Sequence, residues 1–271
     1  MTVASGNNMS ITTIGENLIH YEALGRGEPL IFIHGWLGSW RYWWSSMQAL
    51  STHYRTFAFD LWGFGDSSKP ADKYSFDEYV EMLNQFVERL GIVHPVTIVG
   101  HSLGAAVGLR YATQHPEAVQ RLAAVAMPVR GQYIHNRLAQ NDSESFISRV
   151  LGRNNTYPEI EAELRKTDSA AMNKVAGELL QADFAAELDE ASIPVLLVFG
   201  ADDPVIRQPS GEDHHLQETH DRRAYILLES CHHFPMLEEG AKFNRLILDF
   251  LRSNNNLSEL SPKETWKRRT H

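Results

Sequence analysis

The sequence Val96-Thr97-Ile98-Val99-Gly100-His101-Ser102-Leu103-Gly104-Ala105 decides the fold of this 271-residue chain. Its first four residues include three apolar β-branched side chains and predict a short buried strand. Apolar residues at helical spacing follow from Leu103 to His115 and predict a helix. The chain must turn from strand to helix within one residue, and Gly100 and Gly104 leave room where the backbones crowd. This Gly-x-Ser-x-Gly pattern predicts a nucleophile elbow that exposes the Ser102 hydroxyl at the positive end of a helix.

The five-letter pattern alone does not establish an active site. At ordinary frequencies of glycine and serine it should recur roughly 0.1 times in a chain of this length. The alternative is a glycine-rich turn that carries an incidental serine. The rest of the sequence decides between the two.

Composition narrows the class of protein. A hydrophobic content of 43% is ample for the core of one large α/β domain, or of one with a modest insertion. The net charge of −9 argues against a nucleic-acid partner and against an anionic membrane surface. The single cysteine, Cys231, excludes an intrachain disulfide and fits a reducing compartment. No signal-peptide pattern and no apolar run near 20 residues are present, so we expect a cytoplasmic protein without a membrane span.

Predicted strands and helices alternate along most of the chain. The strands are continuous apolar runs, which is typical of a mostly parallel sheet covered by helices on both faces. We predict strands at residues 10–14, 18–24, 29–33, 55–59, 96–99, 122–127, 193–199 and 224–228. We predict helices in this part of the chain at residues 40–50, 76–90, 103–115 and 238–251.

The alternation stops between residues 131 and 190. No strand is predicted there, and helical patterns cover residues 143–151, 157–165 and 170–180. We therefore expect residues 131–190 to form a helical cap over the carboxyl edge of the sheet, with residues 1–130 and 191–252 as the core. Residues 253–271 form a polar tail that we expect to be frayed.

A serine nucleophile requires a base and a carboxylate that orients the base. In an open parallel sheet both must come from loops at the carboxyl ends of strands. The loop at residues 199–204 offers Asp202 and Asp203, and the loop at residues 230–235 offers His232 and His233. The order serine, aspartate, histidine is the chain order of α/β-hydrolases.

The chain resembles the α/β-hydrolase-fold enzymes from His34 to Glu238, nearly its whole length. The resemblance rests on His34-Gly35-Trp36, Asp60-Leu61-Trp62-Gly63-Phe64-Gly65-Asp66-Ser67, Gly100 to Gly104, Gly200 to Asp203, and His233-Phe234-Pro235. It implies a mostly parallel central sheet with helices on both faces and a helical cap insertion. In the family the acid lies three residues after the glycine that ends its strand, which selects Asp203. The family's histidine precedes an apolar residue and often a proline, which selects His233 and leaves His232 where glycine is usual.

The same resemblance implies an oxyanion hole. Its N–H groups would be those of Leu103, at the first turn of the helix, and of Trp36. Trp36 is also expected to line the acyl pocket, and further pocket candidates follow strand ends or flank the serine: His34, Phe64, His101, Met127 and Phe234. We favour a structural role for His34 over a catalytic one. No residues have metal-ligand spacing and no glycine-rich phosphate loop follows a strand, so we expect no metal and no cofactor.

These features predict a serine hydrolase of the carboxylesterase class. It would cleave small-molecule esters with short to medium acyl chains, through an acyl-enzyme intermediate. The alternatives are a cap-gated small-molecule sensor of the same fold with little turnover, and a C–C bond hydrolase or perhydrolase with the same triad. A serine at the elbow argues against haloalkane dehalogenases and epoxide hydrolases of this fold, which use a carboxylate there. The sequence leaves the natural substrate and the oligomeric state open.

Overall fold

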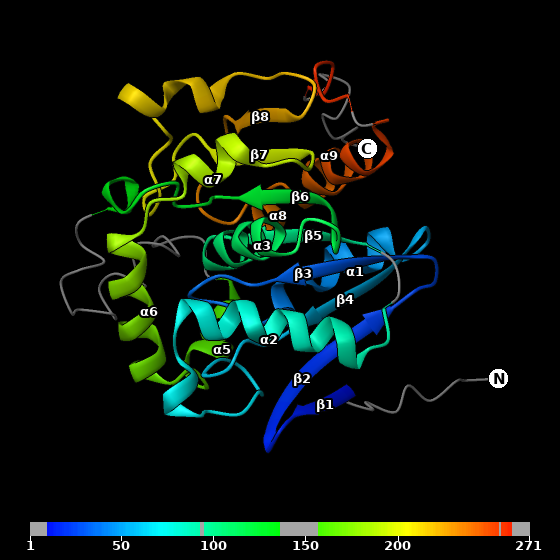
Figure 1. The fold of residues 1–271 in the computed structure, drawn as a ribbon, viewed down its shortest axis with the longest axis vertical. Coiled ribbons are helices and arrows are strands. Elements are labelled where there is room, and N and C mark those ends of the chain that lie inside the picture. The colour runs from blue at the N-terminus through cyan, green and yellow to red at the C-terminus, as the bar shows by residue number, and fades with distance from the viewer. Residues whose placement is uncertain (1–9, 93–94, 136–156, 255, 262–271) are drawn as a thin grey trace.

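In the computed structural model, which describes residues 10–92, 95–135, 157–254 and 256–261, eight strands form one sheet (Figure 1). The order across the sheet is β1-β2-β4-β3-β5-β6-β7-β8. The strands are β1 Ser10–Ile14, β2 Asn17–Leu24, β3 Glu28–Ile33, β4 Tyr54–Phe59, β5 Val96–His101, β6 Val119–Val125, β7 Val195–Gly200 and β8 Arg223–Leu228.

The sheet is mostly parallel, as the sequence predicts. Only the pairings of β1 with β2 and of β2 with β4 are antiparallel, and the other pairings are parallel. Every residue of the central strand β5 is buried, which is why this strand is a continuous apolar run up to the glycine. The carboxyl ends of β3 and β5 to β8 therefore share one edge of the sheet.

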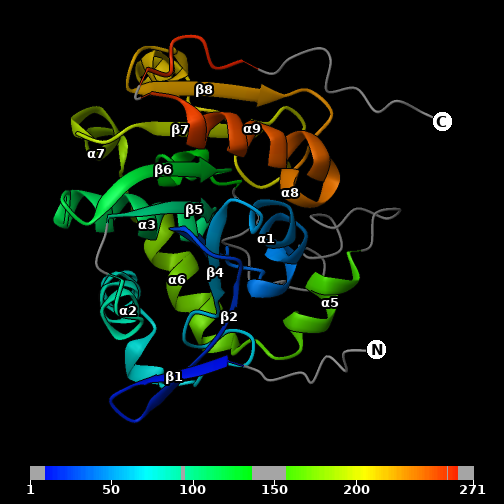
Figure 2. The ribbon, with the colours of Figure 1, turned by 90° about the vertical axis from the view of Figure 1, so that its right-hand side faces the viewer.

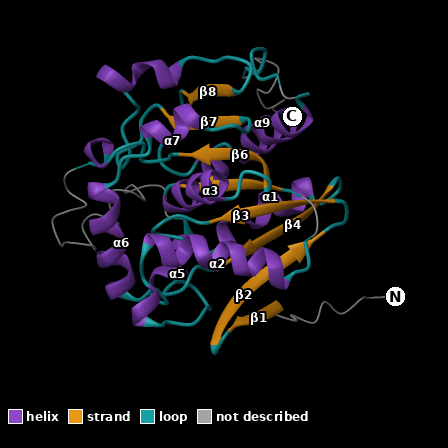
Figure 3. Ribbon diagram, in the orientation of Figure 1, coloured by secondary structure: helices purple, strands orange, loops and turns teal. Residues whose placement is uncertain are grey.

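Helices cover both faces of the sheet (Figures 2 and 3). Helices α2 and α3 pack together on one face, and α1 and α9 pack together on the other. The helices are α1 Trp44–Leu50, α2 Phe76–Arg89, α3 Leu103–Gln114, α5 Pro158–Leu164, α6 Ser169–Gln181, α7 Ala185–Glu190, α8 Pro235–Glu238 and α9 Gly240–Arg252. Short 3-10 helices are η1 Trp40–Trp43, η2 Ala71–Lys73, η3 Gly131–Tyr133 and η5 Gly211–Gln217.

The chain between β6 and β7 supplies α5, α6 and α7, and α6 lies beside the edge at which the parallel strands end (Figure 1). Backbone hydrogen bonds pair the segment that follows β6 with the segment between α6 and α7. The N–H of Gly131 donates to the carbonyl of Ala182 at 2.9 Å, and that of Phe184 donates to Val129 at 2.8 Å. The helix predicted at residues 143–151 lies outside the described residues.

Three local expectations differ from the structure. The strand predicted at 122–127 ends at Val125, because Ala126 takes a left-handed φ of 46° and donates its N–H to Val198 of β7. The closing helix is split into α8 and α9 because Glu239, at φ −127° and ψ 44°, interrupts the helix. The frayed tail is wrong at Leu257, which is fully buried and donates its N–H to the carbonyl of Asp221.

Candidate active site

The turn between β5 and α3 holds Ser102 in a left-handed conformation, with φ 50° and ψ −111°. This region is costly for any residue with a Cβ, so the surroundings must fix it. The N–H of Ser102 donates to Val125 at 2.8 Å on the neighbouring strand. A Cβ on Gly100 would collide with the backbone of Gly104 and Ala105, and a Cβ on Gly104 would collide with the backbone of β3 and His34. Both glycines of the motif are therefore required by close packing.

Asp203 and His233 lie next to each other at the carboxyl ends of β7 and β8. His233 Nδ1 is 2.8 Å from Asp203 Oδ2, and both side chains are buried. The other oxygen, Oδ1, accepts the N–H groups of Val205 at 2.7 Å and Ile206 at 3.0 Å. An ionised carboxylate accepts only, so Nδ1 of His233 carries the proton and Nε2 is left as the basic atom. Asp202, the other candidate acid, is exposed.

The loop that carries His233 is held by Glu238 of α8. The N–H of His232 donates to Glu238 Oε2 at 2.6 Å, and the N–H of Phe234 donates to Oε1 at 2.9 Å. One side chain thus fixes the Cys231–His232 peptide group before His233 and the His233–Phe234 peptide group after it. The Nδ1 atom of the His232 ring also lies 3.0 Å from Glu238 Oε2, and about half of the His232 side chain is exposed. Of the two adjacent histidines, only His233 lies in a pocket with Ser102.

Ser102 and His233 share one pocket with Trp36, and the rest of its wall is apolar. The apolar residues come from four separate parts of the chain, including helix α6 of the insertion: Leu37, Pro128, Ile134, Ala176, Leu179, Val205 and Ile206. The indole Nε1 of Trp36 donates to the carbonyl of Met172 in α6 at 2.8 Å. This bond ties the pocket wall contributed by the core to the wall contributed by the insertion.

The further pocket candidates of the sequence analysis are not among the residues that form this wall. None of the five further candidates lines it: His34, Phe64, His101, Met127 and Phe234. All five are 1% exposed or less and pack into the core instead. Met127 lies beyond the early end of β6, and His101 and Phe234 adjoin Ser102 and His233 in the sequence, where successive side chains project in different directions. The residues that replace them, on α6 and after β7, carry no motif that would mark them in the sequence.

The two buried histidines of that set have their hydrogen bonds satisfied within the core. His34 Nδ1 lies 2.8 Å from the carbonyl of Gly35, and His34 Nε2 accepts the N–H of Leu61 at 2.9 Å. Burial lowers the pKa of His34. A neutral ring with the proton on Nδ1 satisfies both contacts. The structural role favoured for His34 agrees with this arrangement.

The family comparison agrees with this architecture. The family model for the alpha/beta hydrolase fold matches residues 28–158, which include the elbow. The chain is an alpha/beta-hydrolase-fold protein.

Curated alpha/beta-hydrolase relatives include enzymes of two reaction types. The chain is 27% identical to a 2-hydroxy-6-oxo-6-(2'-aminophenyl)hexa-2,4-dienoic acid hydrolase of Metapseudomonas resinovorans, over 85% of this chain and 86% of that protein. It is 29% identical to a pimeloyl-[acyl-carrier protein] methyl ester esterase of Nitrosomonas europaea, over 83% of this chain and 96% of that protein. A solved hydrolase from Pseudomonas aeruginosa PA01 superposes with a TM-score of 0.77 at 22% identity, covering 91% of this chain and 99% of that one. No helix among the described residues is long and apolar enough to cross a membrane.

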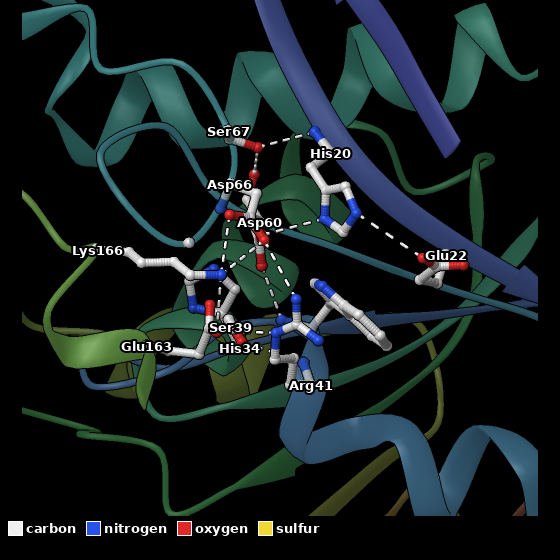
Figure 4. A network of polar contacts seen from close by, with 12 residues as sticks. His20, Glu22, His34, Ser39, Arg41, Asp60, Asp66, Ser67, Glu163 and Lys166 are labelled. Carbon is white, nitrogen blue, oxygen red and sulfur yellow. Dashed lines mark hydrogen bonds and ion pairs between the residues drawn. The ribbon is translucent and has the colours of Figure 1, made fainter. Parts of the chain in front are cut away.

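A second polar cluster joins residues of β2, of the loop after β4 and of the insertion (Figure 4). Its centre is Asp60, whose carboxylate accepts the N–H of Trp40 at 2.8 Å and that of Asp66 at 2.9 Å. His20, Asp60 and Asp66 place donor atoms within 4.8 Å of one another, which is close enough to hold a metal ion. However, Lys166 Nζ lies 2.9 Å from both carboxylate oxygens of Asp66, and a cation there competes with any metal. The cluster fits a hydrogen-bonded turn better than a metal site.

The same cluster joins the insertion to the core. Glu163 of α5 is buried and contacts Arg41 Nε at 2.8 Å and Lys166 Nζ at 3.0 Å (Figure 4). Arg41 belongs to η1 of the core, so a charged pair crosses between the two parts of the molecule. Burial raises the pKa of Asp66, but the hydrogen bonds and charge of Lys166, together with the charges of His20 and Arg41, outweigh burial and lower the pKa. These contacts place α5 beside the core.

Proposed function

We propose that the protein is a carboxylic ester hydrolase with Ser102 as nucleophile, His233 as general base and Asp203 as the group that orients His233. One observation carries the proposal: Ser102 and His233 line the same apolar pocket, while Nδ1 of His233 is bonded to a buried carboxylate. A serine hydroxyl is a weak nucleophile at neutral pH, and an imidazole held in this tautomer supplies the base that it needs.

The proposed reaction has two halves. In the first, Ser102 Oγ attacks the acyl carbon of the ester while His233 Nε2 takes the hydroxyl proton. The tetrahedral intermediate then expels the alcohol, which receives that proton, and leaves an acyl-enzyme. In the second half, His233 removes a proton from water, the resulting attack releases the acid, and Ser102 regains its proton.

The N–H groups of Leu103 and Trp36 are proposed to hold the oxyanion in both halves. Leu103 is the first residue of α3, so its N–H has no acceptor four residues earlier within the helix and points along the positive end of the dipole. Trp36 lies in the pocket wall beside Ser102. Losing one such donor typically costs about 3–4 kcal/mol of transition-state stabilisation.

The pocket wall supports neutral substrates with short to medium acyl chains. Its side chains are apolar apart from Trp36, Ser102 and His233, and Leu179 and Ala176 of α6 close it on the side of the insertion. Apolar walls favour an alkyl chain and offer no partner to a second charged group on the substrate.

Turnover of p-nitrophenyl esters with acyl chains from about C2 to C16 tests the proposal. We expect multiple turnovers, with the highest kcat/KM at about C4 to C8, because the insertion closes the pocket. A single turnover followed by a stable acylated protein would instead support the small-molecule sensor. Faster turnover of C16 than of C4 esters would contradict the chain-length preference.

C–C bond hydrolysis is a second candidate, supported by the similarity to the Metapseudomonas resinovorans hydrolase. That relative is named for a substrate that is a carboxylic acid, and no arginine or lysine lines the described pocket here. A buried carboxylate without a partner is costly, so the pocket favours an uncharged ester. Assay with a vinylogous dienoic acid distinguishes the two, since we expect no cleavage of it.

A further inference from the structure

His101 lies directly before Ser102 but does not line the pocket, and only 1% of it is exposed. Its ring is packed against the loop of the proposed base, with a centroid distance of 4.6 Å to the ring of His233. A Cβ on Gly35 would come within 2.7 Å of His101 Nδ1, so the glycine of the His34-Gly35 pair is what gives the ring its space. The sequence thus places an imidazole where the elbow, the Gly35 turn and the base loop meet.

The hydrogen bonds of this ring define its protonation. His101 Nε2 lies 2.8 Å from the carbonyl oxygen of His233, which can only accept, so Nε2 carries a proton. His101 Nδ1 lies 3.0 Å from the hydroxyl of Tyr42. That hydroxyl accepts the N–H of Gly35 at 2.5 Å and has one proton left to donate. A neutral His101 with the proton on Nε2 satisfies all three contacts.

We propose that His101 is a positioning residue. It links the loop that carries His233 to the turn at Gly35 and Trp36, through hydrogen bonds that run from Gly35 to Tyr42, from Tyr42 to His101, and from His101 to the carbonyl of His233. The proposal rests on the ester hydrolase mechanism above. His101 fixes the backbone that carries the base, while Tyr42 fixes the His34–Gly35 peptide group, one residue before Trp36. The base and one proposed oxyanion donor are therefore positioned by the same buried chain.

The chain works only with a neutral ring. A proton on Nδ1 would remove the acceptor for Tyr42 and place a cation 4.6 Å from a ring that becomes an imidazolium during catalysis. The titratable groups that face His101 are His34, Tyr42 and His233. Burial, with His233 and His34 as further causes, lowers the pKa of His101 well below its ordinary value.

Nitrogen NMR of the ¹⁵N-histidine-labelled protein tests the first step without any substrate. We expect the His101 ring to stay neutral, with the proton on Nε2, as the pH falls through the range in which an ordinary histidine titrates. Tyr42→Phe should shift the Nδ1 resonance of His101, because it removes the hydroxyl that donates to this atom. A His101 ring that titrates near its ordinary pKa, or that carries its proton on Nδ1, would overturn the proposal.

Kinetics of His101 variants test the second step. His101→Leu should lower kcat by ~10–100-fold with KM changed by less than about twofold, because the ring orients the base but does not touch substrate. His101→Gln, whose amide N–H can reach the His233 carbonyl, should recover most of kcat. His214→Leu, the same change at an exposed position of η5, is the matched control. Wild-type kcat in folded His101→Leu, or no recovery in folded His101→Gln, would reject the positioning role.

The rate of Ser102 phosphonylation by a fluorophosphonate separates this proposal from the proposed function. We expect His101→Leu to slow the labelling and His101→Gln to restore it. If the wild-type protein turns over no ester but is labelled with this pattern, the ester hydrolase proposal fails and the positioning role stands. If esters are turned over and the labelling rate is the same in wild type and both variants, only the positioning role fails.

Discussion

At the scale of single residues, the backbone of Ser102 is costly, and the site depends on that conformation. Left-handed φ at a non-glycine residue costs about 1–3 kcal/mol, and the packing of Gly100 and Gly104 leaves the chain no alternative. The side chain of Ser102 makes no capping hydrogen bond to α3 although it occupies the capping position. The hydroxyl is therefore not needed for the start of the helix and is available for chemistry.

Ser102→Ala should leave the fold unchanged, because alanine is no larger and no capping bond is lost. Its esterase kcat should fall by at least about 10³-fold, with the residual rate supplied by the oxyanion donors. Thermal unfolding and p-nitrophenyl butyrate turnover measure the two effects. A folded variant that retains a tenth of wild-type activity would exclude Ser102 as the nucleophile.

The two adjacent histidines should behave very differently on substitution. His233→Gln should lose about as much activity as Ser102→Ala, because nucleophile and base act as a unit. His232→Gly should be mild: Glu238 binds the backbone N–H of His232, which glycine keeps, and the half-exposed ring pair contributes only about 0–1 kcal/mol. Turnover of both variants at one pH decides the assignment. An inactive His232→Gly with an active His233→Gln would reverse it.

At the scale of elements, helix α6 is the part of the insertion that shapes the pocket. Ala176 and Leu179 are three residues apart and lie on one face of the helix, which is the face turned to the pocket. The Trp36 indole bonded to the carbonyl of Met172 holds this face in place. The helix itself is evident from the sequence, since its apolar spacing and the capping Asp168 define it. Which core residues it would meet depends on tertiary packing and is not encoded in any local pattern.

Leu179→Ala should shift the preference of the esterase toward esters with longer acyl chains, because it enlarges the pocket where α6 lines it. The ratio of kcat/KM for C8 over C4 esters should rise several-fold relative to wild type, at a stability cost of ~2 kcal/mol from lost packing. Leu180→Ala, at the neighbouring half-buried position outside the pocket, is the control. An unchanged ratio in a folded Leu179→Ala would place the acyl chain elsewhere.

At the scale of the whole molecule, the sequence predicts the strands, helices and turns that local patterns determine. It does not predict the contacts between side chains that are far apart in the chain. The sheet and the shared edge of its parallel strands follow from the apolar runs in the sequence. The elbow follows from Gly100 and Gly104, whose spacing around Ser102 matches the places where the backbone is too crowded for a Cβ. The sequence does not point to Tyr42, which holds the ring of His101 beside His233, because Tyr42 belongs to no motif beyond its own turn. The contact of Arg41 with Glu163 joins residues 122 positions apart, and such a pair has no signal in one sequence.

The pH dependence of stability is also a property of the whole molecule, because it sums over every group whose pKa changes on folding, including His215, whose raised pKa beside Asp189 acts in the opposite sense to a buried neutral ring. Burial lowers the pKa of both His34 and His101 below the ordinary value of 6.5. Between the folded pKa and the unfolded pKa, the unfolded chain binds protons that the folded chain does not, so stability rises with pH in that window. The contribution of each ring is therefore complete above about pH 6.5 and is lost as the pH falls below it.

Urea unfolding between about pH 8 and 5 should accordingly show a stable plateau followed by a decline that begins near pH 6.5, before most carboxylates titrate. Each histidine can add up to about 1.4 kcal/mol per pH unit to the slope. His101→Gln removes one of the two groups, so its free energy of unfolding should depend less steeply on pH than that of the wild type, whatever its absolute value. His214→Leu should keep the wild-type slope, since His214 is exposed. A folded His101→Gln with the same slope as the wild type from pH 7 to about pH 5 would contradict neutral burial of His101, because a histidine that folds without a pKa change contributes no slope.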